Sequence, residues 1–200
     1  MRLNNKKIFL IYIILPVTFA LLSSCSTSTS ISSWKNEPAN ENRFKNLLVM
    51  VLIKDLEYRT SMENQLVSDF KKMGINSVKS LDIMSPVEKY SKDDLDSILQ
   101  INNFDGILTL KYEGSIVENE KRNGIKYYKY YRKFFKPIRR KGYIESHKTV
   151  IFESILFSSV TEKNVWVATT KTTDSSGPED LALSVSNALI NDLLKNRLIK

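Results

Sequence analysis

The N-terminus constrains this chain most, because a short apolar segment there separates a basic start from a polar remainder. Arg2, Lys6 and Lys7 precede Ile8 to Leu22, a run of 15 mostly apolar residues. A helix needs roughly 20 apolar residues to cross the hydrocarbon core of a membrane, so this run is too short. A basic start, a short apolar run and then small residues are typical of a secretory signal peptide. The pattern therefore predicts that residues 1–24 are removed.

The residues at the predicted cleavage site, Leu22-Ser23-Ser24-Cys25, resemble the lipobox of bacterial lipoproteins. The resemblance implies cleavage after Ser24, attachment of diacylglycerol to the Cys25 sulfur and acylation of the new amino group. Several acyl chains anchor a protein stably, whereas one chain is marginal. Cys25 is the only cysteine, and lipidation accounts for it where no disulfide can. In such lipoproteins Ser26 after the cysteine implies sorting to the outer membrane, with the domain facing the periplasm.

The chain after Cys25 begins with a polar segment. Ser26 to Ser33 is almost entirely serine and threonine, and Lys35 to Asn42 is also polar. Such a composition cannot build an apolar core. We therefore expect residues 25–43 to be a lipidated, flexible tether and residues 44–200 to be a single domain.

From residue 44 on, apolar patterns of strand type and helix type alternate. Leu47 to Ile53 is a short aliphatic run typical of a buried strand, and Ile75 to Met84 predicts a second strand. Between them, apolar residues recur every three or four positions and stop at Gly74, which predicts an amphipathic helix with a left-handed glycine after it. The other predicted elements are a short helix capped by Ser91, a strand from Gly106, a hairpin of Val150–Val160 with Val165–Thr172, and a closing helix over Leu181–Leu193.

The predicted order of elements is β-α-β-α-β, a basic insertion, and then β-β-α. Alternation of strands and helices favours a sheet covered by helices. We expect an α/β (α+β) domain with a mixed sheet of about five strands and about three helices, all on one face of the sheet.

Several motifs on these elements resemble those of small bacterial envelope lipoproteins of poorly known function. The motifs are Arg59 and Glu63 on the first helix, Asp105-Gly106-Ile107-Leu108 at the third strand, and Val165-Trp166-Val167-Ala168-Thr169-Thr170 on a late strand. The resemblance implies fold kinship with LpoB-type activators of penicillin-binding proteins, the TolB N-terminal domain and CsgG-type secretion lipoproteins. A shared fold does not transfer function, and the resemblance implies no catalytic residue.

No combination of residues predicts catalysis, a cofactor or a metal. His147 is the only histidine, and a lone histidine is more often structural than catalytic. The sequence has no thiolate or multi-imidazole zinc motif, no phosphate-binding glycine loop and no nucleophile elbow. Asp93, Asp94 and Asp96 suit a helix N-terminus better than a calcium loop. Arg59 with its neighbouring glutamates is expected to form a solvated face with local ion pairs. We therefore expect a protein that is not an enzyme.

The most unusual composition lies in the insertion, residues 119–148. Between Glu120 and Tyr143 it holds ten basic residues against one acidic residue, a local charge of +9. The mature chain has 27 basic and 22 acidic residues, a charge of +5, so the rest of it is net acidic and the positive charge is concentrated here. The candidate residues for contact with an anionic ligand or a membrane are Lys129, Arg132, Lys133, Lys136, Arg139, Arg140, Lys141, Tyr127, Tyr130, Tyr131, Phe134 and Phe135.

Two conformations of the insertion are compatible with its sequence. In a helix, the aromatic residues from Tyr127 to Phe135 fall on one stripe with the cations opposite, as in an interfacial amphipathic helix. In an extended conformation they form a long tyrosine-rich hairpin, which the strand preference of tyrosine also allows. For either conformation, the alternative to a binding role is a solvated loop whose aromatic residues fold back on the sheet.

The predicted export limits the partners available to the protein. The membrane itself holds the lipid anchor on Cys25, and no nucleic-acid partner is expected outside the cytoplasm. The first hypothesis is a non-catalytic binding or scaffolding lipoprotein in envelope assembly or maintenance, with an envelope protein or the cell wall as partner. The alternative is binding of anionic lipid or lipopolysaccharide through the basic aromatic insertion.

Overall fold

The computed structural model describes residues 27–36, 43–122, 126–131, 134–139 and 143–200, and it describes side chains for residues 27–36, 43–120 and 144–200. The signal peptide, Cys25 and four of the candidate contact residues, Arg132, Lys133, Arg140 and Lys141, lie outside the described residues. Among the helices that are described, none combines the length and the apolar character that a membrane span requires.

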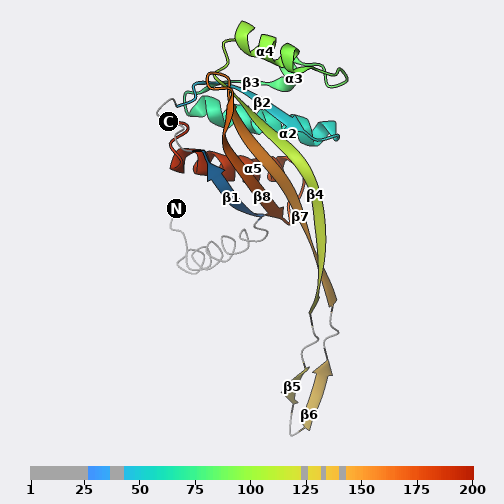
Figure 1. Cartoon of the computed structure of the whole chain (residues 1–200). Coiled ribbons are helices and arrows are strands. Elements are labelled where there is room, and N and C mark those ends of the chain that lie inside the picture. Colours follow the sequence, from blue (N-terminus) through green and yellow to red (C-terminus); the bar gives the residue numbers. More distant parts are fainter. Residues whose placement is uncertain (1–26, 37–42, 123–125, 132–133, 140–142) are drawn as a thin grey trace, which may run out of the picture.

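Six strands form one mixed sheet in the order β1-β8-β7-β4-β2-β3 (Figure 1). Strand β2 pairs in parallel with β3 and with β4, and the other neighbours are antiparallel. The mixed α/β fold is confirmed, with a sixth strand at the edge of the sheet. The strands are Ser28–Lys35 (β1), Asn46–Leu52 (β2), Asn76–Lys79 (β3), Gly106–Arg122 (β4), Tyr143–Ser158 (β7) and Lys163–Thr173 (β8).

Helices cover both faces of the sheet, so the prediction that all of them lie on one face is wrong. Helices α2 (Leu56–Lys72) and α5 (Pro178–Lys195) pack on one face, and α3 (Ser80–Ile83) and α4 (Lys92–Ile101) lie on the other. Strand β2 shows why. Leu47, Val49 and Val51 belong to the larger core, whereas Leu48 and Met50 alternate with them and belong to the smaller one. An apolar run without alternation needs cover on both sides.

The predicted end of the first helix at Gly74 and the predicted capping box at Ser91 are confirmed. Asp55 accepts hydrogen bonds from the backbone N–H groups of Glu57 and Tyr58, and α2 is followed by Gly74 with a φ of 77°. Ser91 and Asp94 form a reciprocal capping box at the start of α4, and this hydrogen bonding lowers the pKa of the Asp94 carboxyl. The acidic cluster therefore stabilises a helix N-terminus.

The second predicted strand is shorter than expected, because the chain enters α3 after β3 ends at Lys79. The carboxylate of Glu63 on α2 accepts hydrogen bonds from the Ser80 hydroxyl at 2.6 Å and from the Leu81 N–H at 3.0 Å. These bonds hold the start of α3 against α2 and take the chain out of the sheet.

The polar segment after Cys25 is not a spacer throughout, because Ser28–Lys35 forms strand β1. It pairs antiparallel with β8, from Ser28 opposite Thr173 to Lys35 opposite Trp166. The Thr29 hydroxyl lies 2.7 Å from that of Thr172 and 2.6 Å from that of Ser184 on α5. The prediction of a flexible tether over residues 25–43 is therefore wrong for residues 28–35. An edge strand can be polar, since hydroxyls bond across strands and one face can remain solvated.

The described residues of the insertion are extended, so the hairpin alternative is confirmed and the helix is wrong. Lys126–Tyr131 (β5) pairs antiparallel with Phe134–Arg139 (β6) in a separate two-stranded sheet. Lys129 lies opposite Lys136, and Tyr130 lies opposite Phe135. Residues alternate between faces with a period of two in a strand, so the single aromatic stripe of a helix does not form. The strand preference of tyrosine accounts for this outcome.

Candidate functional site

Strands β4 and β7 continue past the rest of the sheet as a two-stranded ribbon, which we call the arm. It consists of Val117–Arg122 paired with Tyr143–Lys148. Strand β8 ends at Thr173, opposite Thr149, just before the arm begins. Figure 1 shows the arm projecting away from the helix-covered sheet and leading toward β5 and β6. The arm therefore presents both of its faces to its surroundings.

A bulge interrupts β4 at Tyr112–Gly114, shortly before the arm begins. The register with β7 shifts between Tyr112 and Gly114, and Gly114 has a φ of 139°, which side chains other than glycine rarely tolerate. Beyond the bulge, apolar side chains are exposed to solvent. Val117 is 59% exposed and Ile144 is 63% exposed, so the arm carries uncovered apolar side chains.

Strand β1 starts at the same end of the sheet as the arm. Ser28 lies opposite Thr173, Thr173 opposite Thr149, and Thr149 opposite Ile116. One residue earlier, the Thr27 hydroxyl donates to the Asp180 carboxylate on α5. Hydrogen bonds from the Ser176 backbone N–H and from Thr27 lower the pKa of the Asp180 carboxyl. The first described residues are therefore fixed to the sheet and to the N-terminus of α5.

His147 lies at the base of the arm and contacts the end of β8. Its Nδ1 is 2.5 Å from the Asp174 carboxylate, whose other oxygen accepts a hydrogen bond from the Lys148 N–H at 3.2 Å. The hydrogen bond to Asp174 raises the pKa of His147, and the same bond lowers the pKa of Asp174. His147 thus joins the arm to the sheet, in agreement with the structural role predicted for a lone histidine.

Three residues on the arm could share a cation, although the sequence predicts no metal site. Glu120 lies directly opposite Glu145, and each of Glu120, Glu145 and His147 can offer one ligand atom within 4.8 Å of the others. Both glutamates also have further interactions, and Nδ1 of His147 is taken by Asp174. We therefore assign no metal to this group.

A cavity of about 660 Å³ opens beside the base of the arm. It lies beyond the carboxyl end of β2, next to the first residues of α2 and α5. Three lysines, two tyrosines and several aliphatic side chains come together here from segments far apart in the sequence. The lining residues are Leu52, Ile53, Lys54, Asp55, Tyr58, Lys111, Tyr112, Lys148, Val150, Ser175 and Leu181.

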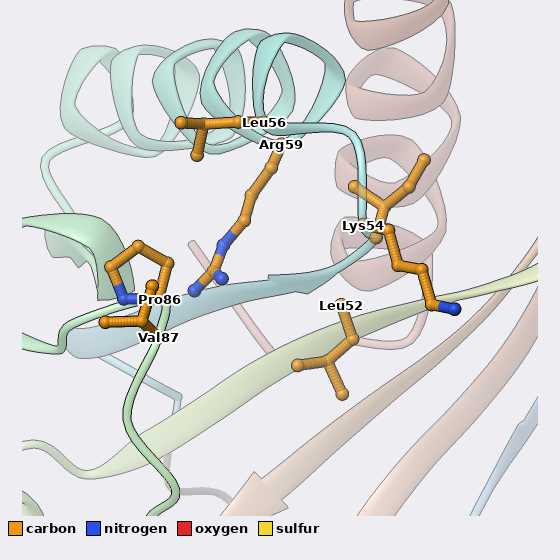
Figure 2. Close-up of a pocket in the computed structure, with 7 residues that line it drawn as sticks. Leu52, Lys54, Leu56, Arg59, Pro86 and Val87 are labelled. Carbon is orange, nitrogen blue, oxygen red and sulfur yellow. The ribbon is translucent and has the colours of Figure 1, made fainter.

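A second cavity of about 550 Å³ shares Leu52, Ile53 and Lys54 with the first. Figure 2 shows Arg59 reaching from α2 toward the loop of Pro86 and Val87. The Arg59 Nε is 3.2 Å from a Glu63 oxygen, and Nη2 donates to the Ser80 hydroxyl at 2.9 Å. Glu63 is fully buried, so the prediction of a solvated face is wrong for this pair. The Glu63 carboxylate joins α2 to β2 and α3.

The structure brings some of the predicted contact residues together and reveals others that the sequence did not indicate. Lys129, Lys136, Arg139 and the aromatic residues from Tyr127 to Phe135 lie on the ladder of β5 and β6. The lysine-lined cavity was missed, because its members share no local motif. The aspartate of the strand motif, Asp105, accepts hydrogen bonds from the N–H groups of Lys45 and Asn46, so it positions β2 and takes no part in either cavity.

Comparison with known proteins gives similarity to solved structures alone. No protein-family model matches the sequence, and no curated protein matches it either. The PelC dodecamer of Paraburkholderia phytofirmans is 16% identical, over 80% of this chain and 94% of that chain, with a TM-score of 0.47. Lipoprotein GNA1162 of Neisseria meningitidis is 13% identical, over 75% of this chain and 98% of that chain, with a TM-score of 0.41. The similar structures thus include a lipoprotein, and kinship with LpoB-type, TolB and CsgG-type proteins stays a prediction.

Proposed function

We propose that the protein is a lipid-anchored, non-catalytic binding protein of the bacterial cell envelope, and that its arm contacts the surface of the membrane that holds Cys25. The observation that supports this function best is the position of β1. The first residue of β1, Ser28, follows the predicted lipidation site, Cys25, by three residues. Ser28 lies at the same end of the sheet as the arm.

The lengths involved favour contact between arm and membrane. Three residues span at most about 11 Å, so a lipidated Cys25 keeps Ser28 within that distance of the membrane surface. The arm extends past Thr149 by six β4 residues, or about 20 Å at roughly 3.3 Å per residue. If the strands are perpendicular to the membrane, with the arm end of the sheet nearest to it, the arm reaches the membrane. If the strands are tilted toward the membrane plane, the arm lies along the surface.

The chemistry of the arm and insertion suits an anionic lipid surface. The exposed Val117 and Ile144 can enter the interface, and the insertion beyond them carries ten basic residues. Amphipathic aromatic side chains and long cationic side chains are the types that settle at the headgroup level. The geometry thus favours the lipid alternative over a protein or cell-wall partner. Sorting to the outer membrane remains the expectation from Ser26.

The test uses the mature, lipidated protein in vesicles that contain phosphatidylglycerol. Because lipid occupies the Cys25 sulfur, a cysteine introduced elsewhere is the only free thiol for an environment-sensitive fluorophore. Val117→Cys places it on the arm, and Val160→Cys places it in the turn between β7 and β8, at the opposite end of the sheet. Both valines are well exposed, at 59% and 70%, so they form a matched pair.

We expect nitroxide-labelled lipids to quench the fluorophore on the arm and not the one in the turn. Ser substitutions of Arg132, Lys133, Arg139 and Arg140 should weaken the quenching, and so should high salt, since exposed charges are screened over about 8–10 Å at physiological ionic strength. Equal quenching at the two positions would refute the proposal. Absence of quenching at position 117 would contradict contact between the arm and the membrane, and would favour a protein or the cell wall as the partner.

A further inference from the structure

We propose that the cavity beside the base of the arm binds the phosphate-bearing headgroup of an anionic glycerophospholipid. The cavity is the one of about 660 Å³ lined by Lys54, Lys111 and Lys148. Its volume falls within the roughly 300–1,000 Å³ of typical small-ligand sites. This inference deepens the proposed function, because it names a lipid that the membrane-facing end of the domain would hold.

The position of the cavity is one at which mixed and parallel sheets bind ligands. Strand β2 has parallel neighbours on both sides, β3 and β4. The chain passes from β2 to β3 through α2 on one face, and then to β4 through α4 on the other. The strand order thus reverses at β2, and a crevice forms outside its carboxyl end. Leu52, Ile53 and Lys54, which end this strand, line the cavity.

The electrostatics of the lining favour an anion. Lys54, Lys111 and Lys148 stand against a single acidic lining residue, Asp55. The Asp55 carboxylate already accepts two backbone N–H bonds as the cap of α2. Glu113 pairs with Lys111 at 2.7 Å outside the lining, which leaves Lys54 and Lys148 as the cations with the most charge to offer.

The apolar part of the lining distinguishes a lipid from a free phosphate. Leu52, which is 45% exposed, and the partly buried Ile53 offer an aliphatic surface that inorganic phosphate cannot use, with the buried Val150 and Leu181 beneath them. The hydroxyl groups of Tyr58 and Tyr112 add donors for ester and glycerol oxygens. The cavity lies at the end of the sheet from which both β1 and the arm emerge, so a lipid of the same leaflet needs little displacement to enter it.

The experiment measures binding to the mature lipoprotein in a neutral detergent by calorimetry. The probes are dihexanoyl phosphatidylglycerol, dihexanoyl phosphatidylcholine and glycerol 3-phosphate. We expect phosphatidylglycerol to bind at least about tenfold more tightly than the other two, a difference that one or two charge-assisted hydrogen bonds can supply. Replacing Lys54 and Lys148 by Gln should lower its affinity at least about tenfold.

The matched control is the pair Lys92→Gln and Lys163→Gln, which removes the same charge from exposed positions away from the cavity and should leave the affinity unchanged. Equal binding of the two lipids would overturn the proposal, as would an unaltered affinity in the Lys54 and Lys148 variant. Binding of glycerol 3-phosphate as tight as that of phosphatidylglycerol would identify a soluble phosphate ester as the ligand and overturn the lipid assignment.

A shortened variant separates this inference from the proposed function. Replacing residues 121–144 by Asn-Gly removes most of the insertion and leaves every lining residue in place. It should bind phosphatidylglycerol as the full protein does. Suppose that the shortened variant binds phosphatidylglycerol, and that the fluorophore at position 117 of the protein with a complete insertion is not quenched. The cavity is then a lipid site and the arm is not a membrane contact. Loss of phosphatidylglycerol binding in this folded variant would refute the cavity site.

Discussion

The same two strands, β4 and β7, run through two regions with opposite properties. In the helix-covered sheet they contribute Leu108, Phe152 and Leu156, all 1% exposed or less. In the arm they contribute Val117 and Ile144, which are 59% and 63% exposed. Burial of apolar side chains stabilises a fold, whereas apolar side chains left exposed are available to a partner. We therefore expect the stability of the fold to reside in the covered sheet, and the proposed binding to involve the arm and its base.

The largest effect on this comparison is expected from Glu63→Ala in the covered sheet. The buried carboxylate accepts bonds from Val51, Ser80, Leu81 and Arg59, and its loss leaves these donors unpaired. We expect the free energy of unfolding to fall by about 3–5 kcal/mol, measured by urea denaturation. Asn64→Ala, at an exposed position of α2, should change it by less than about 0.5 kcal/mol. A similarly small change in the free energy of unfolding of Glu63→Ala would show that this hydrogen-bond network is not essential to stability.

A smaller loss is expected from Gly106→Ala at the start of β4. An added Cβ would lie 2.7 Å from the Phe157 carbonyl oxygen and 2.6 Å from the Phe44 ring. Overpacking of this kind costs about 1–3 kcal/mol. Gly177→Ala is the control, since a Cβ there meets no atom within 4 Å. Equal midpoints of urea denaturation for the two variants would contradict the close approach at Gly106.

One substitution should make the covered sheet more stable. The buried Thr170 hydroxyl has no hydrogen-bond partner among the described residues. Thr170→Val keeps the shape and removes the unsatisfied group, so we expect a gain of about 1 kcal/mol. Thr172→Val should instead lose stability, because that hydroxyl bonds to Thr29. Thermal denaturation of both variants checks the opposite signs.

At the junction of the two regions, His147 should respond to pH. Its hydrogen bond to Asp174 raises its pKa above 6.5, so its contribution to stability is complete below pH 6.5 and is lost as the pH rises through the folded pKa. The pKa of Asp174 is lowered from 3.8, so its contribution is lost only as the pH falls through that lowered value. NMR titration of this single histidine should show the raised pKa, and Asp174→Asn should return it toward 6.5. An unchanged pKa in that variant would exclude Asp174 as the cause.

The smallest effect on stability is expected from removal of the arm's outer part and the insertion. Replacing residues 121–144 by Asn-Gly joins Glu120 to Glu145, which lie directly opposite each other, through a two-residue turn suited to a hairpin. The free energy of unfolding should change by less than about 1 kcal/mol, because this segment lies beyond Thr149, the last residue of β7 that pairs with β8. A loss of several kcal/mol would show that the insertion is part of the stable fold.

Periodicity in the sequence predicts the covered sheet well. The aliphatic run of β2, the spacing in α2 and the capping box at Ser91 each depend on neighbours within a few positions, and each is confirmed. Strand β1 was missed, because a Ser/Thr-rich composition does not distinguish a polar edge strand from a spacer. Ile31 and Trp34, whose side chains favour strands, were the available signal.

The candidate site is less predictable than the fold. The basic charge of the insertion is visible in the sequence, and the hairpin was one of two conformations that its tyrosines allow. The cavity, in contrast, requires Lys54, Lys111 and Lys148 to meet across three elements of the fold. Such a group depends on sheet order, and no local pattern of residues encodes it.

The pairing of β1 with β8 also determines how the protein would bear mechanical load. If Cys25 is acylated as proposed, a force on the anchor enters β1 at Ser28 and acts along the strand axis. The inter-strand hydrogen bonds are perpendicular to this direction, so all eight residue pairs from Ser28 to Lys35 are sheared together and do not open one after another.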